Sequence, residues 1–378
     1  MFEALPEPVL VIGAEGDDLS GRRVLLANPA ARELFRIGQD RPALVGVVRS
    51  PDVLAAVEAA LAGGERHVDV AGRGRQWSAL ARSVPGEQGA PSMALLHLRD
   101  VTEARALEAM RADFLANASH ELRSPLASLT GFIETLRGPA RDDAAARDRF
   151  LDIMAVQADR MGRLIADLLS LSRIELNEHV APHGRADLAL VAGDVLDALT
   201  PQLAARGVTV SVTGAGPREA IVAGDRDQIV QVLQNLIENA VKYSPDGGAV
   251  EIEITPDLGA EALRAPRKAE RARHPLLVPE REPARRYAAV RVADHGPGIA
   301  RQHLPRLAER FYRVEGQKSG DRLGTGLGLA IAKHIINRHR GGLVVESAPG
   351  EGAAFTVYLP RADGPEASDR NKTVVQSS

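Results

Sequence analysis

The stretch "NASHELRSPLASL" (residues 117–129) decides how the middle of this chain folds. Its apolar side chains recur three and four residues apart, a spacing that predicts one apolar stripe along a helix. The same spacing starts near Thr102 and continues through Leu136. The stripe consists of Leu115, Ala118, Leu122, Leu126, Leu129, Ile133 and Leu136.

His120 lies off this stripe. It is two residues from Ala118, which places it about 200° around the helix. A histidine that packs in a core would lie on the stripe, so we expect His120 to face solvent, with Glu121 and Ser124 on its exposed flank. This placement favours a histidine that is chemically modified over one that only packs.

A second amphipathic helix is predicted after the turn "RGPARDD" (137–143), where glycine and proline interrupt the pattern. Its stripe consists of Phe150, Ile153, Met154, Met161, Leu164, Ile165, Leu168, Leu169 and Leu171. Two long helices joined by a short turn form an antiparallel hairpin whose apolar stripes stay half exposed. We therefore expect a homodimer in which two hairpins form a four-helix bundle.

The flanking regions mix strands and helices, so the predicted fold class is multidomain α+β. Residues 1–101 form an α+β module in which a strand leads to a helix that opens at Asn28-Pro29. We divide the rest into a hairpin (102–178), an α/β domain (185–361) and a disordered tail (362–378). Within the α/β domain we expect helices at 187–206, 225–244 and 325–339, strands at 208–214, 249–255, 287–294, 342–347 and 353–359, and a flexible basic insertion at 257–286.

Two glycine-rich segments point to a phosphate-bearing ligand. "DHGPGI" (294–299) follows a predicted strand, and "GTGLGLAIAKHII" (324–336) opens a predicted helix. Glycine lets the backbone approach a ligand closely, and a helix N-terminus presents unpaired N–H groups to an anion. Each segment alone fits an ordinary turn equally well. Together, with Gly316 and Gly320 between them, they predict a mobile flap over the ligand.

The helix "QNLIENAVKYS" (234–244) carries polar residues that suit the same ligand. Asn235, Asn239 and Lys242 share one helical face, and Glu238 lies near its edge. Amide and carboxylate oxygens suit Mg²⁺, and a lysine suits phosphate. The alternative is an exposed polar face, but asparagine is unfavourable inside a helix and needs a reason to be there.

These motifs, in this order, resemble those of the sensor histidine kinases of bacterial two-component systems. The resemblance rests on "HELRSP" (120–125), Asn235 with Asn239, "DHGPG" (294–298), "RFYR" (310–313) and "GTGLG" (324–328). It covers residues 105–360, and within the family it is greatest to the phosphate-regulon branch. Residues 1–101 resemble a PAS sensor module, joined to the kinase through Asp100 and Thr102.

The resemblance implies the fold of each part: a PAS-like α/β module, a histidine-phosphotransfer hairpin and a GHKL-type α/β sandwich that binds ATP. His120 would accept the phosphoryl group, Glu121 would orient its ring and accept its proton, and Ser124 would position water for dephosphorylation of the partner. Asn239, Asn235 and Glu238 would hold Mg²⁺ on the phosphates. Asp294 would bind the adenine amino group. The remaining ATP-binding residues would be Lys242, Tyr243, Gly296, Gly298, Arg310, Phe311, Arg313, Gly324, Thr325, Gly326, Leu327 and Gly328.

Composition excludes several other functions. The chain has 378 residues, a formal net charge of −3 and no cysteine. The charge balance gives no basis for a nucleic-acid surface. The absence of cysteine rules out disulfides, thiolate metal sites and cysteinyl photochemistry, and it fits a reducing cytoplasm.

The implied function is autophosphorylation of His120 by ATP, followed by transfer to an aspartate of a response regulator. We see no membrane segment or secretory signal in the sequence. The protein is therefore expected in the cytoplasm, either free or as the cytoplasmic part of a longer, membrane-associated kinase. Two alternatives remain. One is a PAS-coupled scaffold that binds ATP without turnover. The other is an enzyme that mainly dephosphorylates its regulator, although Ser124 stands where the family usually has threonine or asparagine.

Overall fold

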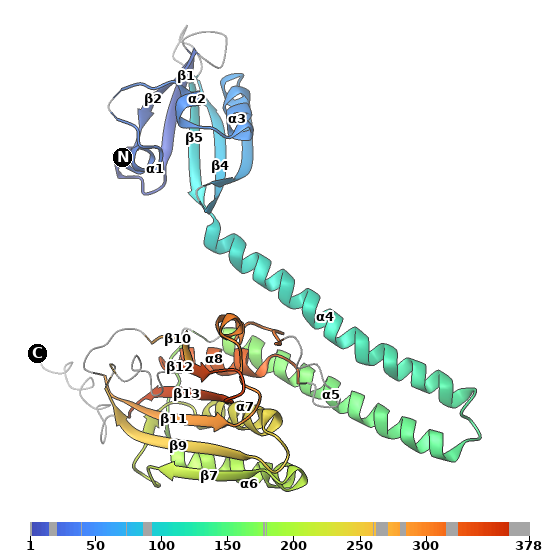
Figure 1. Cartoon of the computed structure of the whole chain (residues 1–378). Coiled ribbons are helices and arrows are strands. Elements are labelled where there is room, and N and C mark those ends of the chain that lie inside the picture. Colours follow the sequence, from blue (N-terminus) through green and yellow to red (C-terminus); the bar gives the residue numbers. More distant parts are fainter. Residues whose placement is uncertain are drawn as a thin grey trace, which may run out of the picture. The chain divides into compact units, whose positions relative to one another are not determined.

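The computed structural model describes residues 2–14, 21–38, 40–72, 74–85, 93–176, 178, 180–259, 261, 271–279, 285–314 and 324–362. The chain forms two compact units, Met1–Ala116 and Asn117–Ser378 (Figure 1). Helix α4 (Thr102–Arg137) begins in the first unit and continues into the second. The expected flap around Gly316 and Gly320 and the expected tail beyond Ala362 lie outside the described residues.

The first unit is an antiparallel sheet with helices. Its strands lie in the order β2 (Arg22–Ala27), β1 (Val9–Ala14), β5 (Met93–Asp100), β4 (Arg75–Val84) and β3 (Glu65–Gly72). A short 3₁₀ helix, η1 (Phe2–Ala4), precedes them, and α1 (Pro29–Phe35) opens at the predicted Asn28-Pro29. The helices α2 (Leu44–Val47) and α3 (Pro51–Leu61) are additional to those that the sequence predicted.

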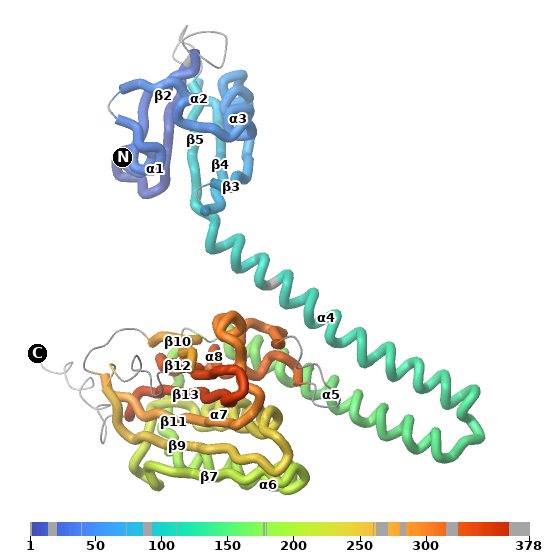
Figure 2. Tube along the Cα trace, in the orientation of Figure 1, coloured from blue at the N-terminus to red at the C-terminus, as the bar shows by residue number. Residues whose placement is uncertain are grey.

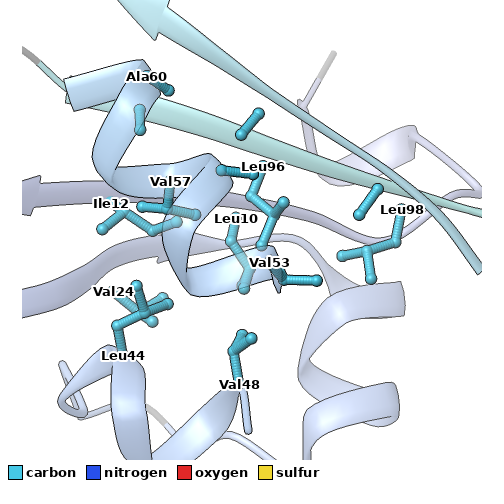
Figure 3. Packing of buried hydrophobic residues seen from close by; sticks show 14 of the residues in the cluster. Leu10, Ile12, Val24, Leu44, Val48, Val53, Val57, Ala60, Leu96 and Leu98 are labelled. Atoms are coloured by element: carbon cyan, nitrogen blue, oxygen red, sulfur yellow. The ribbon is translucent and has the colours of Figure 1, made fainter. Parts of the chain in front are cut away.

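Aliphatic side chains fill the core of this unit. Helix α3 places Val53 and Val57 in the same buried cluster as Leu10 of β1 and Leu96 of β5 (Figure 3). All four are at most 2% exposed. Burying such a side chain contributes about 1.5–3 kcal/mol, so this cluster is the main source of the unit's stability.

The side chain of Asn28 joins separate segments of the first unit through hydrogen bonds. Its Oδ1 accepts hydrogen bonds from the N–H groups of Val9 (3.0 Å) and Ala31 (2.9 Å). Its Nδ2 donates to the carbonyls of Leu5 (3.1 Å) and Glu7 (2.8 Å). The side chain and its bonds to Val9 and Ala31 are buried, so these two N–H groups have no access to water in its place.

The second unit begins with the predicted helical hairpin. Helix α4 continues through Pro125 to Arg137, and α5 (Ala144–Leu176) returns beside it. The rings of Phe132 and Phe150 contact each other across the hairpin, with centroids 5.4 Å apart. Part of the apolar stripe is exposed in the single chain, as expected for a surface that a second copy covers: Leu126, Ile133, Ile165 and Leu169 are each at least 45% exposed.

A six-stranded sheet forms the centre of the rest of this unit (Figure 2). Its order is β10 (Ala272–Leu277), β12 (Gly342–Ser347), β13 (Ala353–Pro360), β11 (Tyr287–Asp294), β9 (Ala249–Leu258) and β7 (Thr209–Gly214). Only β7 and β9, among these pairs, run parallel. The short strands β6 (Arg185–Asp187) and β8 (Ile221–Ala223) pair separately.

Helices α7 (Arg226–Tyr243) and α8 (Gly328–Arg338) pack on this sheet and on each other, and α6 (Leu188–Arg206) packs on α7. A 3₁₀ helix, η4 (Arg301–Arg306), follows β11. Helix α7 lies between α6 and α8 and contacts β11, and α5 of the hairpin packs against α8. The predicted helices and strands of this region are present with ends shifted by a few residues.

The stretch expected to be a flexible insertion, 257–286, is partly a strand. β9 extends to Leu258, and β10 pairs with the edge of β12 despite Pro275. Proline is tolerated on an edge strand because it needs no ladder partner there. Arg273 of β10 pairs with Glu346 of β12 at 3.5 Å. A basic residue of the kind that indicated a loop therefore forms an ion pair between two strands.

One helix of the described residues, α6, is long and apolar enough to cross a membrane by length and composition alone. This is weak evidence, because core helices pass the same test. Its residues Val191, Val195 and Leu199 are buried in the contact that α6 makes with the rest of the domain.

We predict that Asn28→Ala lowers the stability of the first unit by about 3 kcal/mol, because it leaves buried backbone groups without partners. Denaturant unfolding followed by the fluorescence of Trp77, the chain's single tryptophan, reports on this unit. Ser50→Ala is the control, since Ser50 caps α3 with one long bond to Val53 (3.5 Å) and should cost about 1 kcal/mol or less. Equal losses in the two variants would contradict the role given to Asn28.

Candidate functional site

A cavity of about 550 Å³ opens in the second unit, within the size range of small-molecule sites. Helix α7, the end of β11, the glycine segment before α8 and helix α5 all contribute to its lining. Most of the predicted ATP-binding residues meet here: Asn235, Glu238, Asn239, Lys242, Tyr243, Asp294, Gly298, Arg313, Gly324, Thr325, Gly326 and Gly328. Gly296, Arg310, Phe311 and Leu327 lie beside the cavity and not in its lining.

Asp294 provides a buried acceptor in the cavity lining. Its Oδ1 accepts hydrogen bonds from the N–H groups of Gly296 (2.9 Å) and Ala353 (3.2 Å). Burial raises the pKa of this carboxyl group, and the two backbone hydrogen bonds oppose that rise. Ile299 and Phe355 add apolar lining. A fixed acceptor among apolar side chains suits the amino group of a planar base.

Two glycines are required by the backbone of the site. Gly298 has φ +69°, and a Cβ there would lie 1.9 Å from the carbonyl oxygen of Ala348. Gly326 has φ +74°, and a Cβ there would lie 2.9 Å from Cα of Phe311. The Phe311 N–H donates to the Gly326 carbonyl (2.9 Å), which joins the two predicted motifs directly.

The cavity lining also carries cationic side chains. Burial lowers the pKa of Lys242 to about 8, and the nearby charge of Arg313 adds to this effect. The Lys242 ammonium lies 4.9 Å from the centre of the Tyr243 ring. Burial raises the pKa of Tyr243, so the hydroxyl stays protonated near neutral pH. Two cations beside a glycine segment suit a polyphosphate.

Oxygen ligands for a hard cation line the same cavity. Asn235, Glu238 and Asn239 line the cavity together on α7. The Asn235 Nδ2 donates to the Gly328 carbonyl (3.1 Å), and Glu238 Oε1 accepts from Gln234 (2.7 Å). No cluster of three His, Asp or Glu side chains suited to a metal occurs in the described part of the chain. The amide and carboxylate oxygens fit Mg²⁺, which keeps waters and binds mainly through substrate phosphates.

His120 and its neighbours lie on α4, outside the cavity lining. His120 and Ser124 are exposed, as the helical phase predicted. Glu121 is half-buried, and its Oε2 accepts a hydrogen bond from Nη2 of Arg160 on α5 (3.0 Å). The sequence pattern placed Glu121 on the exposed flank, and the partner on the facing helix accounts for the difference.

Helix α5 contributes residues that the sequence did not indicate. Asp167 accepts a hydrogen bond from the Thr325 hydroxyl (2.6 Å), and that hydroxyl accepts one from the Leu327 N–H (3.3 Å). Burial raises the pKa of Asp167. Farther along α5, Glu175 pairs with Arg310. In this arrangement two residues of the predicted ATP-binding motifs are bonded to carboxylates of the hairpin.

The sequence contains a pattern that indicates a polar face on α5. Arg160, Arg163 and Asp167 recur at spacings of three and four, so they share one side of α5, and all three line the cavity. A polar face of this kind is common on exposed helices. Only the packing of α5 against α8 distinguishes it from an ordinary solvated surface.

We predict that affinity for ATP falls as pH rises through about 8, because Lys242 then loses its proton and its attraction for phosphate. Below that pH the ammonium is charged and the contribution is complete. Titration calorimetry with a non-hydrolysable ATP analogue between pH 6.5 and 9.5 measures this. Lys242→Met should abolish the inflection and weaken binding at pH 7, whereas Lys333→Met on α8 should keep it. An unchanged pH profile in Lys242→Met would refute the assignment.

Comparison with protein families identifies each part of the chain. Residues 224–363 match the family model described as histidine kinase-, DNA gyrase B- and HSP90-like ATPase. Residues 110–177 match the His Kinase A (phospho-acceptor) domain, and residues 2–106 match the PAS fold. The first range contains most of the cavity lining, the second contains most of the hairpin with His120, and the third contains the five-stranded sheet.

Curated relatives agree with these matches. The chain is 35% identical over 72% of its length to the phosphate regulon sensor protein PhoR of Pseudomonas aeruginosa, of which it covers 55%. It is 32% identical over 72% to the sensor-like histidine kinase SenX3 of Mycolicibacterium smegmatis, of which it covers 63%. It is 34% identical over 89% to the alginate biosynthesis sensor protein KinB of Pseudomonas aeruginosa, of which it covers 53%. The chain therefore spans between half and two thirds of these relatives, and it belongs to the family of sensor histidine kinases.

Proposed function

We propose that this protein phosphorylates itself on His120 with ATP and then passes the phosphoryl group to an aspartate of a response regulator. In the first step a bond forms between a ring nitrogen of His120 and the γ-phosphorus, and the bond from that phosphorus to the ADP oxygen breaks. The ring proton passes to Glu121, and ADP leaves. Neutral imidazole suits this step because the unperturbed pKa of histidine is about 6.5.

The observation that carries the proposal is the pairing of two features in one unit. His120 is exposed beside a carboxylate on a hairpin, and the cavity holds a buried acceptor for a base and two cations for phosphates. Phosphoryl transfer depends on positioning and charge neutralisation more than on covalent help from the protein. Lys242 and Arg313 supply such charge, and Asn235, Glu238 and Asn239 would hold Mg²⁺, which neutralises phosphate charge when bound.

The domain division supports this assignment. We propose a PAS sensor module over 1–101, the phosphotransfer hairpin over 102–178 and the ATP-binding domain over 185–361. We also propose that the protein acts in the cytoplasm, where ATP and response regulators are found. The signal is open to test. A phosphate-regulon role rests on the name of PhoR, while KinB, which aligns over 89% of this chain, is named for alginate biosynthesis.

Ser124 supports a second activity, dephosphorylation of the regulator. It is exposed one helical turn after His120, where its hydroxyl can hold water. Serine lacks the β-methyl group that stiffens a threonine rotamer, so we rank this activity below the kinase reaction. A scaffold that binds ATP without turnover is disfavoured because His120, Glu121, Asn239 and Asp294 are all present.

Labelling with γ-³²P-ATP tests the kinase proposal. Wild-type protein should acquire an acid-labile, base-stable label, and His120→Gln should acquire none. His67→Gln is the matched control, because His67 is also exposed but lies in the first unit. Absence of label in the wild type, or label that survives in His120→Gln, would refute the proposal.

We also propose that two chains associate through the hairpin, since its exposed apolar stripe needs a cover. Leu126→Lys with Leu169→Lys should shift the protein from dimer to monomer in sedimentation velocity. Both residues are 55% exposed in the single chain. Leu190→Lys on α6, at a site that is 52% exposed, should leave the dimer intact. A dimer that persists in the double variant would place the interface elsewhere.

A further inference from the structure

Arg160 of α5 lies between the predicted proton acceptor and the nucleotide cavity. Its guanidinium donates to the Glu121 carboxylate at 3.0 Å, and its side chain is 19% exposed. The same side chain lines the cavity, together with Lys242 and Arg313. It is therefore a residue outside the recognised motifs that contacts the acidic neighbour of His120 and also faces the site of ATP.

The chemistry of arginine suits the contact with Glu121. A guanidinium carries five N–H donors in a fixed plane that matches the geometry of a carboxylate. A glutamate has three rotatable side-chain bonds, and a charged, half-buried partner on the facing helix restricts them.

Arg163 provides an internal comparison on the same helix. It also lines the cavity, but it pairs with Asp159 one turn away on α5 (3.1 Å), and its side chain is 64% exposed. An exposed pair within a helix contributes little. The contact between Arg160 and Glu121 instead joins the two helices of the hairpin, across 39 residues of sequence.

We infer that Arg160 is a positioning residue for the phosphoryl transfer: it holds Glu121 in place beside His120 and aligns that carboxylate with the phosphate end of the bound nucleotide. This inference rests on the proposed kinase activity. Arg160 neither accepts the proton nor forms a bond to phosphorus. Its effect on the reaction passes through Glu121.

The first experiment compares the rates of autophosphorylation of Arg160→Gln, Arg160→Lys and Arg147→Gln. Arg160→Gln should lower kcat by about tenfold or more, because a displaced catalytic group costs on that scale, while KM for ATP changes less than about twofold. Arg160→Lys, which keeps the charge without the planar fork, should recover part of kcat. Arg147 lies on the same helix with a side chain that is 52% exposed and is not part of the cavity lining, so Arg147→Gln should behave as wild type. Equal losses in Arg160→Gln and Arg147→Gln, or an unchanged kcat in Arg160→Gln, would overturn the inference.

A double-mutant cycle tests whether Arg160 acts through Glu121. Once Glu121→Gln has removed the acceptor, adding Arg160→Gln should cause no further loss, because residues that act as one unit are not additive. Losses that multiply would show an independent role and overturn the inference. In Arg160→Lys, thermal unfolding and the affinity for a non-hydrolysable ATP analogue should match those of wild type. If Arg160→Gln folds poorly, Arg160→Lys therefore still tests the inference.

The outcomes separate the inference from the proposed function. If wild-type protein is labelled on His120 and Arg160→Gln is labelled equally fast, only the positioning role fails. If wild-type protein is not labelled, the kinase proposal itself fails.

Discussion

The cavity depends on one buried carboxylate and the two backbone N–H groups that hold it. Asp294 ends β11, and its Oδ1 binds Gly296 in the following turn and Ala353 at the start of β13. A charged group taken out of water is costly unless hydrogen bonds replace its hydration, and these two bonds do so. They fix the strand ends around which the rest of the cavity is arranged.

Close backbone packing follows from that arrangement. A Cβ on Gly296 would lie 2.5 Å from the carbonyl oxygen of Tyr243, and one on Gly352 would lie 2.0 Å from that of Asp294. The end of α7 therefore lies directly against the turn after β11. This contact sets the distance between the Asp294 carboxylate and Lys242. It therefore also sets the length of a ligand that contacts both residues.

Much of the fold could be predicted from the sequence because periodicity fixes which faces are buried. The ends of α4 and α7, and the strands β7, β11 and β12, lie within about two residues of their predicted positions. Helix α3 was not predicted, because the alternating apolar pattern of the surrounding strands dominated this region. Ser50 and Pro51 are nevertheless ordinary signals for the start of a helix. Strand β10 was missed because its basic, proline-containing sequence resembles a loop until β12 is beside it.

The site could be predicted only in part. Motif residues such as Asn239 and Lys242 share a helix, so their spacing alone brings them together. The contributions of Arg160 and Asp167 depend on contacts between separate elements, which spacing within a helix does not reveal. Glu121 is half-buried because it contacts Arg160 on the facing helix, and spacing within a helix does not reveal this contact either.

The hydrogen bond between Thr325 and Asp167 joins the hairpin to the part of the chain that would bind the nucleotide. Thr325 lies in the cavity lining, while Asp167 belongs to the helix that packs beside the one carrying His120. Glu175 and Glu178 extend the contact, to Arg310 and to the side chain of Asn337 (2.6 Å). If ATP binds less tightly while these carboxylates hold their donors, then by reciprocity ATP weakens the hold of the hairpin by the same factor. Part of the free energy of nucleotide binding would then go into releasing the ATP-binding domain from α5.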